Sequence, residues 1–373
     1  LETRKANMKF TCSRSLLAEA INGVSKAVSP RSGQPILEGI LFQAEGFSLT
    51  LTGYDCSMAI ITRLEANILE PGETVLHAKL LGDMVRRLST EEVEISVSEK
   101  GTATIKSGIT EFNIHSMPAA DYPELPMPSA EPTLDLAACD LEEIVESTLY
   151  AVSLDETKPA HTGELFEITP EALRVVALDG YRLAIVEKKV AAQKEISIIV
   201  PGKTLSDVIK LFGDSDDMIH ISADRRFVVF SNEHYTVFSR LLEGQFLDYK
   251  RVIPASGNTR VVVDVRDFID VIERASLIIT ERAKNPLRIL FDKMISVRCE
   301  TGLGAVVDEL PAAIEGEPVE VGFNNRYLLD ALRNSRCDKV AMEISGPLSP
   351  VKVMPVDGEQ FLFLVLPIRF KND

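Results

Sequence analysis

The chain has 373 residues, of which 45% are hydrophobic and 26% charged, and its formal net charge at pH 7 is −16. Such a composition is typical of a folded protein of two or three domains and excludes an intrinsically disordered chain. No apolar run approaches the ~18 residues that a membrane-spanning helix needs. The five cysteines are scattered singly, which excludes a disulfide framework and a Cys-x-x-Cys metal site, so we expect a cytoplasmic protein.

Six amphipathic helices are predicted along the chain, because apolar residues recur at the i, i+3, i+4 and i+7 spacing of a one-sided helix. The first helix, for example, places Leu17, Ile21 and Val24 on one face, and Asp140 and Asp264 are predicted to cap two later helices. The first residues of the six are Leu16, Leu80, Leu141, Leu205, Phe268 and Tyr327. They are separated by 64, 61, 64, 63 and 59 residues, a spacing that indicates an internal repeat.

Short strand-like alternations lie between the helices, as in residues 93–97 and 227–230. Each repeat of about 60 residues is therefore predicted to hold one helix and about four short, mostly antiparallel strands. A slower period pairs the repeats, because residues 178–181 echo residues 52–55. The sequence thus predicts an α+β fold of three duplicated helix-plus-antiparallel-sheet domains, at residues 8–128, 129–256 and 257–373, with residues 1–7 as a tag or extension.

Motifs for catalysis, metal binding or cofactor binding are not found in the sequence. Residues 201–204 resemble the end of a phosphate-binding loop, but Ser197 stands where that loop needs its first glycine. The five histidines lack metal-ligand spacing, and the acidic residues do not cluster. We therefore expect a protein that binds partners and is not an enzyme, with no cofactor and no metal.

The charge is unevenly distributed between the helices and the remaining chain. The six helix segments sum to +1, which leaves −17 on the remainder. One interpretation is that the helices simply present solvated faces, since Lys and Arg are good helix formers. The other is that the helices share a side that faces a polyanion. The acidic total argues against a protein that coats nucleic acid by charge alone.

Several short motifs, in order and at matching intervals, resemble those of the bacterial β sliding clamps, the processivity factors of DNA polymerase III. The resemblance covers residues 8–370, essentially the whole chain. Its markers are residues 8–10, 35–37, 178–184, 243–249 and 366–370.

The resemblance implies a head-to-tail homodimer that closes into a ring around duplex DNA without sequence preference. It implies as partners the replicative polymerase, the clamp loader and other proteins that carry a clamp-binding motif, and no membrane. By matching positions, Phe112 and Ile114 of one chain should meet Ile278 and Ile279 of the other, although all four could instead be ordinary core residues.

Two further sets of residues follow from the resemblance. The cations expected to face DNA are Arg31, Lys79, Arg86, Arg87, Lys203, Lys210, Arg274, Arg333 and Arg336. The wall of a pocket for a short hydrophobic partner peptide is expected at Gly180, Tyr181, Arg182, Leu183, Arg251, Val252, Asn324, Tyr327, Leu348, Leu364, Leu366, Pro367, Ile368 and Arg369. Within it, Leu183, Val252, Leu366 and Ile368 should form the apolar floor, and Arg182, Asn324 and Arg369 should offer hydrogen bonds to the peptide.

The sequence departs from the family pattern at His161, Leu247, Lys284, Pro350 and Phe370, which bears on the choice of peptide. Two other functions stay open at the level of sequence. One is a metabolic enzyme built from duplicated α+β domains, with Asp179 or His161 in a cleft. The other is a scaffold that uses the same repeats without encircling DNA.

Overall fold

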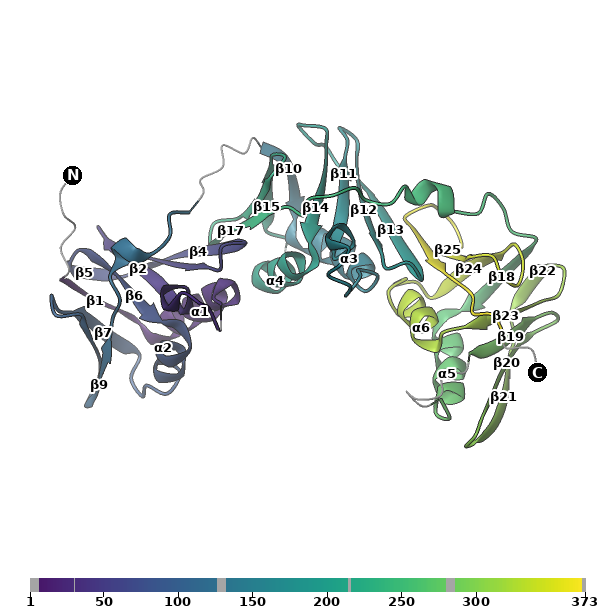
Figure 1. Ribbon diagram of the computed structural model, residues 1–373, viewed down its shortest axis with the longest axis horizontal. Coiled ribbons are helices and arrows are strands. Elements are labelled where there is room, and N and C mark those ends of the chain that lie inside the picture. The colour runs from purple at the N-terminus through teal and green to yellow at the C-terminus, as the bar shows by residue number, and fades with distance from the viewer. Residues whose placement is uncertain (1–6, 30, 126–131, 214–215, 280–285, 371–373) are drawn as a thin grey trace. The chain divides into compact units, whose positions relative to one another are not determined.

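The computed structural model describes residues 7–29, 31–125, 132–213, 216–279 and 286–370, and Figure 1 shows its elements. One pattern recurs six times: a strand runs directly into a helix, and three further strands follow. The predicted repeat of one helix and about four strands is therefore confirmed. Every strand pairing among these residues is antiparallel.

The six copies of this pattern, which we number in chain order, have the following bounds. Copies one and two comprise β1 (Met8–Ser13), α1 (Arg14–Val24), β2 (Gly39–Glu45), β3 (Ser48–Tyr54) and β4 (Met58–Glu65), then β6 (Gly72–His77), α2 (Ala78–Val85), β7 (Glu92–Val97), β8 (Thr102–Ser107) and β9 (Thr110–His115). Copies three and four comprise β10 (Pro132–Ala137), α3 (Ala138–Leu149), β11 (Gly163–Ile168), β12 (Ala172–Leu178) and β13 (Arg182–Lys189), then β14 (Ile196–Pro201), α4 (Gly202–Phe212), β15 (Met218–Ala223), β16 (Phe227–Ser231) and β17 (Tyr235–Arg240). Copies five and six comprise β18 (Thr259–Asp264), α5 (Val265–Ser276), β19 (Leu287–Phe291), β20 (Ile295–Thr301) and β21 (Gly304–Leu310), then β23 (Val319–Phe323), α6 (Asn325–Arg333), β24 (Lys339–Ile344), β25 (Val351–Pro355) and β26 (Phe361–Val365).

A few short elements lie outside the pattern. Two extra strands, one in copy one and one in copy five, are β5 (Asn67–Glu70) and β22 (Ala313–Gly316). The 3-10 helices are η1 (Ser25–Ala27), η2 (Pro35–Glu38), η3 (Ala119–Asp121), η4 (Pro159–His161) and η5 (Tyr249–Val252). Among them, η5 includes Lys250, Arg251 and Val252.

Side-chain caps help to fix where the helices begin. Asp264 Oδ1 accepts a hydrogen bond from the backbone N–H of Asp267 at 3.2 Å and so satisfies one of the free N–H groups of α5. The predicted cap at Asp264 is therefore confirmed. The predicted cap at Asp140 is wrong, because α3 begins at Ala138 and Asp140, inside its first turn, forms an ion pair with Lys188.

Neighbouring copies exchange their first strands. β1 of copy one pairs with β7 of copy two, and β6 of copy two pairs with β2 of copy one. In the same way β10 pairs with β15 and β14 with β11, while β18 pairs with β24 and β23 with β19. The exchange joins six copies into three pairs, which is the duplicated three-domain α+β fold that the sequence predicts. The domain limits at 128 and 256 stay a prediction.

Residues 1–139 and 207–241 form one compact unit. It holds a five-stranded sheet in the order β5-β1-β7-β8-β9 and an eight-stranded sheet in the order β10-β15-β16-β17-β4-β3-β2-β6. Within the larger sheet β17 pairs with β4, so the last strand of copy four lies beside the last strand of copy one. Helices α1 and α2 pack against each other (Figure 1).

Residues 140–206 and 242–373 form the second unit. Its nine-stranded sheet has the order β14-β11-β12-β13-β26-β25-β24-β18-β22, and its four-stranded sheet has the order β21-β20-β19-β23. Here β13 pairs with β26, which joins the last strands of copies three and six. Helices α5 and α6 pack against each other, and α5 also lies on β20 and β21 (Figure 1).

The predicted apolar faces of the helices form the core. Leu17, Ile21 and Val24 of α1 are buried, as are Phe268 and Ile272 of α5. Each such side chain contributes about 1.5–3 kcal/mol through the apolar area removed from water. None of the helices in the described ranges is long and apolar enough to cross a membrane.

Candidate functional site

The residues of the predicted peptide pocket lie on five segments of the second unit: the β12–β13 turn, η5, the start of α6, the loop between β24 and β25, and β26 with the chain end after it. The turn follows from an Asp-Gly pair. Gly180 has a φ of +91°, which a residue with a side chain rarely adopts. Asp179 Oδ1 accepts hydrogen bonds from the backbone N–H groups of Tyr181 at 2.9 Å and Arg182 at 3.1 Å. The turn therefore presents Tyr181 and Arg182 in a fixed geometry.

The chain end is fixed to this turn and to β23. The backbone N–H of Leu366 donates to the carbonyl of Tyr181 at 2.9 Å, and that of Ile368 donates to the carbonyl of Gly322 at 2.8 Å. A side chain at position 322 could not be accommodated, since its Cβ would lie 2.5 Å from the Ile368 carbonyl oxygen. Leu366 and Ile368 are thus held half-buried at the surface.

The apolar floor has a buried layer and an accessible layer. Leu183 and Leu364 face each other across β13 and β26, and both are buried in one cluster with Tyr249 of η5. The apolar side chains of the predicted wall that remain accessible are Tyr181, Val252, Leu348, Leu366, Pro367 and Ile368. An incoming peptide would contact this second layer, while Leu183 supports it from below.

Arg182 is committed to its own neighbours. Its Nε donates to Asp179 at 2.9 Å and its Nη1 to Asp330 of α6 at 2.5 Å. The guanidinium also lies over the rings of Tyr150 and Tyr327, 5.3 and 4.7 Å from their centres, and the side chain is only 14% exposed. We therefore assign Arg182 to positioning the pocket wall, whereas the sequence suggested a hydrogen bond to the peptide.

The other predicted polar residues differ in how free they are. Asn324 Oδ1 caps α6 by accepting from the N–H groups of Arg326 at 3.0 Å and Tyr327 at 3.4 Å. Arg251 pairs with Asp248 at 2.7 Å but is highly exposed, and Arg369 is exposed as well. The two arginines are thus the groups most able to reach a bound peptide.

Aromatic rings lie among and beside the residues of the predicted pocket. Tyr181 stacks on Tyr327 with ring centres 5.9 Å apart, and Tyr150 meets Phe363 edge-to-face at 5.7 Å. Burial raises the pKa of Tyr327 and, more strongly, that of Tyr150, so both hydroxyls stay protonated at neutral pH. Tyr181 remains 61% exposed and is available to a ligand.

Two of the departures from the family pattern, His161 and Phe370, make specific aromatic contacts. His161 meets the ring of Phe246 edge-to-face at 5.5 Å, and burial lowers its pKa, which favours the neutral ring. Phe370 packs beneath the Arg288 guanidinium, 4.3 Å from the ring centre. Lys284 lies outside the described residues.

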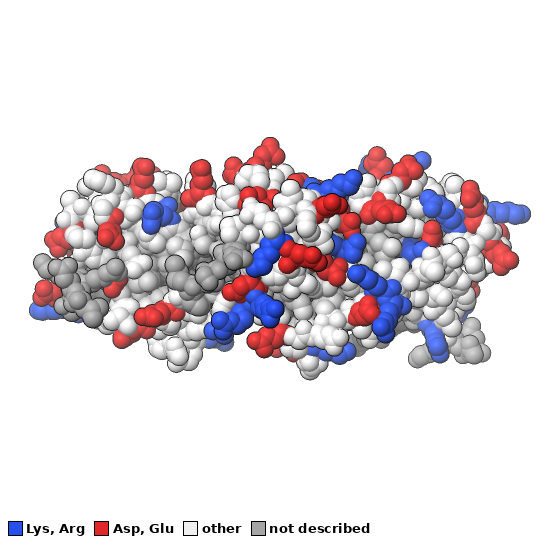
Figure 2. All heavy atoms as spheres, turned by 90° about the horizontal axis from the view of Figure 1, so that it is seen from above, with Lys and Arg blue, Asp and Glu red and all other residues white. Residues whose placement is uncertain are grey.

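All nine cations expected to face DNA are exposed. Four of them pair with carboxylates: Arg86 with Asp83, Arg274 with Asp308, Arg333 with Glu273 and Arg336 with Glu146. In the part of the chain that the structure describes, Arg31, Lys79 and Arg87 form no ion pair. On the face drawn in Figure 2, acidic and basic side chains are interspersed, so that face offers a polyanion no continuous basic surface.

One pair of residues expected at the dimer interface lies on an edge strand, and the other pair, Ile278 and Ile279, packs partly buried against the core that includes α5. Phe112 and Ile114 are half-buried on β9, an edge strand of the five-stranded sheet. Ile278 and Ile279 follow α5, which lies on β21, an edge strand of the four-stranded sheet. Val307 on β21, which the sequence analysis did not name, is 62% exposed.

The sequence analysis did not name Tyr150 or Asp330, although the position of Asp330 could have been recognised. Tyr150 and Asp330 hold Arg182 in place, yet neither belongs to a motif that we recognised. Asp330 follows Tyr327 by three residues, so both lie on one face of α6, and that spacing was visible in the sequence. The described residues include no group of three or more His, Cys, Asp or Glu side chains able to hold a metal.

Comparison with known families decides the relationship. Three family models match, described as the N-terminal, central and C-terminal domains of the DNA polymerase III beta subunit, over residues 8–126, 135–248 and 250–369. The chain belongs to the DNA polymerase III beta subunit family. Members of this family are sliding clamps, which are non-catalytic processivity factors, so the expectation of a protein without enzymatic activity is confirmed.

Relatives and solved structures agree over nearly the full length. The beta sliding clamp of Halalkalibacterium halodurans is 32% identical over 97% of this chain and 100% of its own, and that of Bacillus subtilis is 30% identical with the same coverage. The crystal structure of the Bacillus subtilis sliding clamp superposes with a TM-score of 0.95 at 30% identity, covering 98% of this chain and 100% of its own. A sliding clamp from Bartonella birtlesii bound to griselimycin gives a TM-score of 0.93 at 29% identity, covering 98% and 100%. The β clamp fold predicted from the sequence is therefore confirmed.

Proposed function

We propose that two copies of this clamp close head to tail into a ring around duplex DNA, in the cytoplasm, and tether DNA polymerase III and other replication proteins to it. The observation that carries this proposal is the pairing of the last strands of the six copies. Four of those strands pair within the chain, as β17 with β4 and β13 with β26. Two remain at sheet edges, β9 and β21.

The two open strands belong to complementary positions in the repeat. β9 ends copy two and β21 ends copy five, and each would complete the same kind of last-strand junction if it met the other in a second chain. Because the two edges differ, the contact is heterologous, and a heterologous contact forms a closed ring when its rotation closes. Phe112 and Ile114 would then pack against Ile278 and Ile279 of the partner chain.

Weak contact with phosphates suits a ring that slides. Arg31, Lys79 and Arg87 lack carboxylate partners among the described residues and would contact the backbone, whereas the ion pairs of Arg274 and Arg333 reduce the local positive field. Backbone contacts carry no sequence information, so binding would be independent of DNA sequence. A ring is retained by its topology, and a net charge of −16 is compatible with that.

The pocket beside Tyr181 would hold a short hydrophobic peptide of a partner protein. Its accessible apolar side chains sit on a rigid base, since Arg182, Tyr327 and the chain end are all fixed by contacts. Anchoring a few apolar side chains in such a pocket typically supplies most of the affinity. The replicative polymerase and the clamp loader are the partners that this proposal expects.

Topology can be tested directly on DNA. The clamp is loaded by its clamp loader onto a nicked circular duplex and separated from free protein by gel filtration. It should elute with the circle and be lost after one cut by a restriction enzyme, because a ring slides off a free end. Equal retention on cut and uncut DNA, abolished only by salt, would instead indicate ordinary ionic binding.

The pocket can be tested separately. Leu366→Ala with Ile368→Ala removes two accessible apolar anchors, and we expect loss of binding to a synthetic peptide of leucine and phenylalanine residues while the dimer persists. Leu69→Ala, at an exposed position on β5, is the matched control. Unchanged peptide affinity in the double variant, measured by calorimetry, would show that the pocket is assigned wrongly.

A further inference from the structure

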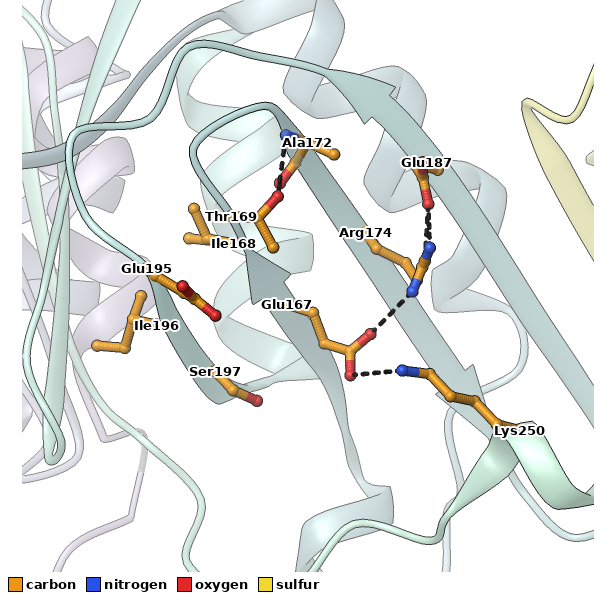
Figure 3. Close-up of a pocket in the computed structure, with 10 residues that line it drawn as sticks. All are labelled: Glu167, Ile168, Thr169, Ala172, Arg174, Glu187, Glu195, Ile196, Ser197 and Lys250. Carbon is orange, nitrogen blue, oxygen red and sulfur yellow. Dashed lines mark hydrogen bonds and ion pairs between the residues drawn. The ribbon is translucent and has the colours of Figure 1, made fainter.

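A second pocket on the same unit lies outside the predicted site (Figure 3). We call it the Glu167 pocket, and its volume is about 630 Å³. Residues from the ends of β11, β12, β13 and β14 line it together with one residue of η5. Its principal polar side chains are Glu167, Arg174, Glu187, Glu195, Ser197 and Lys250.

One hydroxyl and two cationic side chains surround the Glu167 carboxylate. The Tyr249 hydroxyl donates to its Oε2 at 2.5 Å, Arg174 Nη1 lies 3.5 Å from the same oxygen, and Lys250 Nζ lies 4.0 Å from Oε1. Burial, followed by the hydrogen bond to Glu167, raises the pKa of Tyr249 to about 12, so the hydroxyl stays a donor. Arg174 also binds Glu187 through Nη2 at 2.5 Å. These groups form a preformed wall of the pocket.

Glu195 carries the third carboxylate that lines the pocket. Within the described residues Glu195 forms no ion pair, and Figure 3 shows its carboxylate pointing toward Glu167 across the pocket. Three carboxylates against two cations leave the lining with a net charge of −1, in a chain that is itself acidic. An anionic ligand would have to compete with Glu167 for Lys250, whereas an ammonium or guanidinium group would pair with Glu195 directly.

The Glu167 pocket and the predicted peptide pocket share the short helix η5. Lys250 lines the Glu167 pocket, and the next two residues, Arg251 and Val252, belong to the predicted peptide pocket. Tyr249 is buried in one cluster with Leu183 and Leu364, beneath both. Because consecutive Cα atoms lie ~3.8 Å apart, a peptide seated in one pocket needs only a few more residues to reach the other.

We propose that the Glu167 pocket receives a lysine or arginine side chain of a partner protein, placed a few residues from the apolar segment that occupies the peptide pocket. The inference rests on the proposed function, since it extends the same docking surface. The basic side chain pairs with Glu195 and lies against Glu167 and Glu187. The partners are thereby selected for an apolar segment with a basic flank.

Calorimetry with three synthetic peptides tests this proposal. All carry the same segment of leucine and phenylalanine residues, extended by two lysines, two alanines or two glutamates, with each extension made at either end. For the end that reaches the pocket, we expect lysine to bind about three- to tenfold more tightly than alanine and glutamate to bind more weakly than alanine. The advantage of lysine should shrink as salt is raised.

Glu195→Gln should remove the advantage of lysine without changing the affinity for the alanine peptide. Glu171→Gln makes the same charge change at an exposed residue that does not line the pocket, and it should preserve the advantage. If the alanine peptide binds but lysine adds nothing at either end, the Glu167 pocket is not part of the docking surface and the proposed function stands. If no peptide binds at all, the predicted peptide pocket and the Glu167 pocket are both assigned wrongly, and the ring is judged by its retention on circular DNA.

Discussion

The closed and open last-strand junctions of this clamp carry similar side chains in different surroundings. At the closed junctions, Val237 pairs with Ile60 and Ala184 pairs with Phe363, and all four side chains are fully buried. At the open edges, Phe112 on β9 is half-buried and Val307 on β21 is 62% exposed. Two pairs of last strands are therefore joined within the chain, and the last strands β9 and β21 remain at sheet edges.

An open sheet edge carries a risk of unwanted strand pairing, which proteins usually avoid. Exposed edge strands with apolar side chains invite pairing with other chains, and stable monomers blunt them with charges, prolines or bulges. Here β9 alternates apolar and polar side chains without a proline. The difference between the junctions supports the proposal that the open edges meet a second copy. The following variants separate the closed junctions from the open ones.

Phe363→Ala should have the largest effect on stability, because it removes a buried aromatic ring from the closed junction of β13 and β26. The ring is buried, stacks on Phe361 at 4.6 Å and meets Tyr150 edge-to-face. We expect the free energy of unfolding to fall by about 3–5 kcal/mol in urea titrations at fixed protein concentration. Phe47→Ala, the same change at an exposed turn, should stay within about 0.5 kcal/mol. A loss below about 1 kcal/mol for Phe363→Ala would show that the β13–β26 junction is not tightly packed.

Phe112→Asp should act on the open edge alone. A carboxylate placed in an apolar interface weakens association by on the order of 2–4 kcal/mol, so the dimer should dissociate to the 41.1 kDa chain at micromolar concentration. Sedimentation velocity reports this mass. Val307→Asp tests the opposite edge at an exposed position that the fold tolerates, and Phe47→Asp is the control that should leave the dimer intact. If both edge variants remain dimers, the interface lies elsewhere.

Asp330→Ala should loosen the peptide pocket without disturbing the β17–β4 or the β13–β26 junction. Without Asp330, Arg182 keeps only Asp179 as an anionic partner and is less firmly held between the rings of Tyr150 and Tyr327. We expect peptide affinity to fall about tenfold, or ~1.4 kcal/mol, in calorimetry. The matched control is Glu273→Ala, which unpairs Arg333 of the same helix on its exposed face and should leave peptide affinity unchanged. Equal effects of the two variants would mean that α6 responds only to general loss of ion pairs.

Glu164→Gln should have the smallest effect and should alter only the unfolding of the chain. Glu164 is buried on β11, its Oε1 lies 2.9 Å from Thr148 Oγ1, and burial raises its pKa well above 4.5. Between the unfolded and folded pKa values the folded state holds more protons, so stability falls as pH rises, by at most about 1.4 kcal/mol per pH unit. The glutamine variant cannot ionise and should gain about 1 kcal/mol at neutral pH with a flatter pH profile in urea titrations. An identical pH slope in both proteins would contradict a neutral buried Glu164.

Local patterns in the sequence predicted the repeated parts of the fold and not their exchange. The apolar face of α1, from Leu17 to Val24, and the cap at Asp264 depend on neighbours within one turn, which periodicity records. The exchange of first strands joins residues such as Met8 and Val97, which no local pattern connects. The ion pair of Arg182 with Asp330 spans 148 residues in the same way. The Glu167 pocket was missed for this reason, because it collects residues from four strands, the turns beside them and η5.

Small-angle scattering with absolute mass tests the central claim, a dimeric ring, most directly. A ring predicts about 82 kDa, twice the 41.1 kDa of one chain. It also predicts a radius of gyration well above the ~27 Å of a compact globule of that mass, because the centre is hollow. A stable monomer, or a dimer with a radius of gyration near ~27 Å, would contradict the ring.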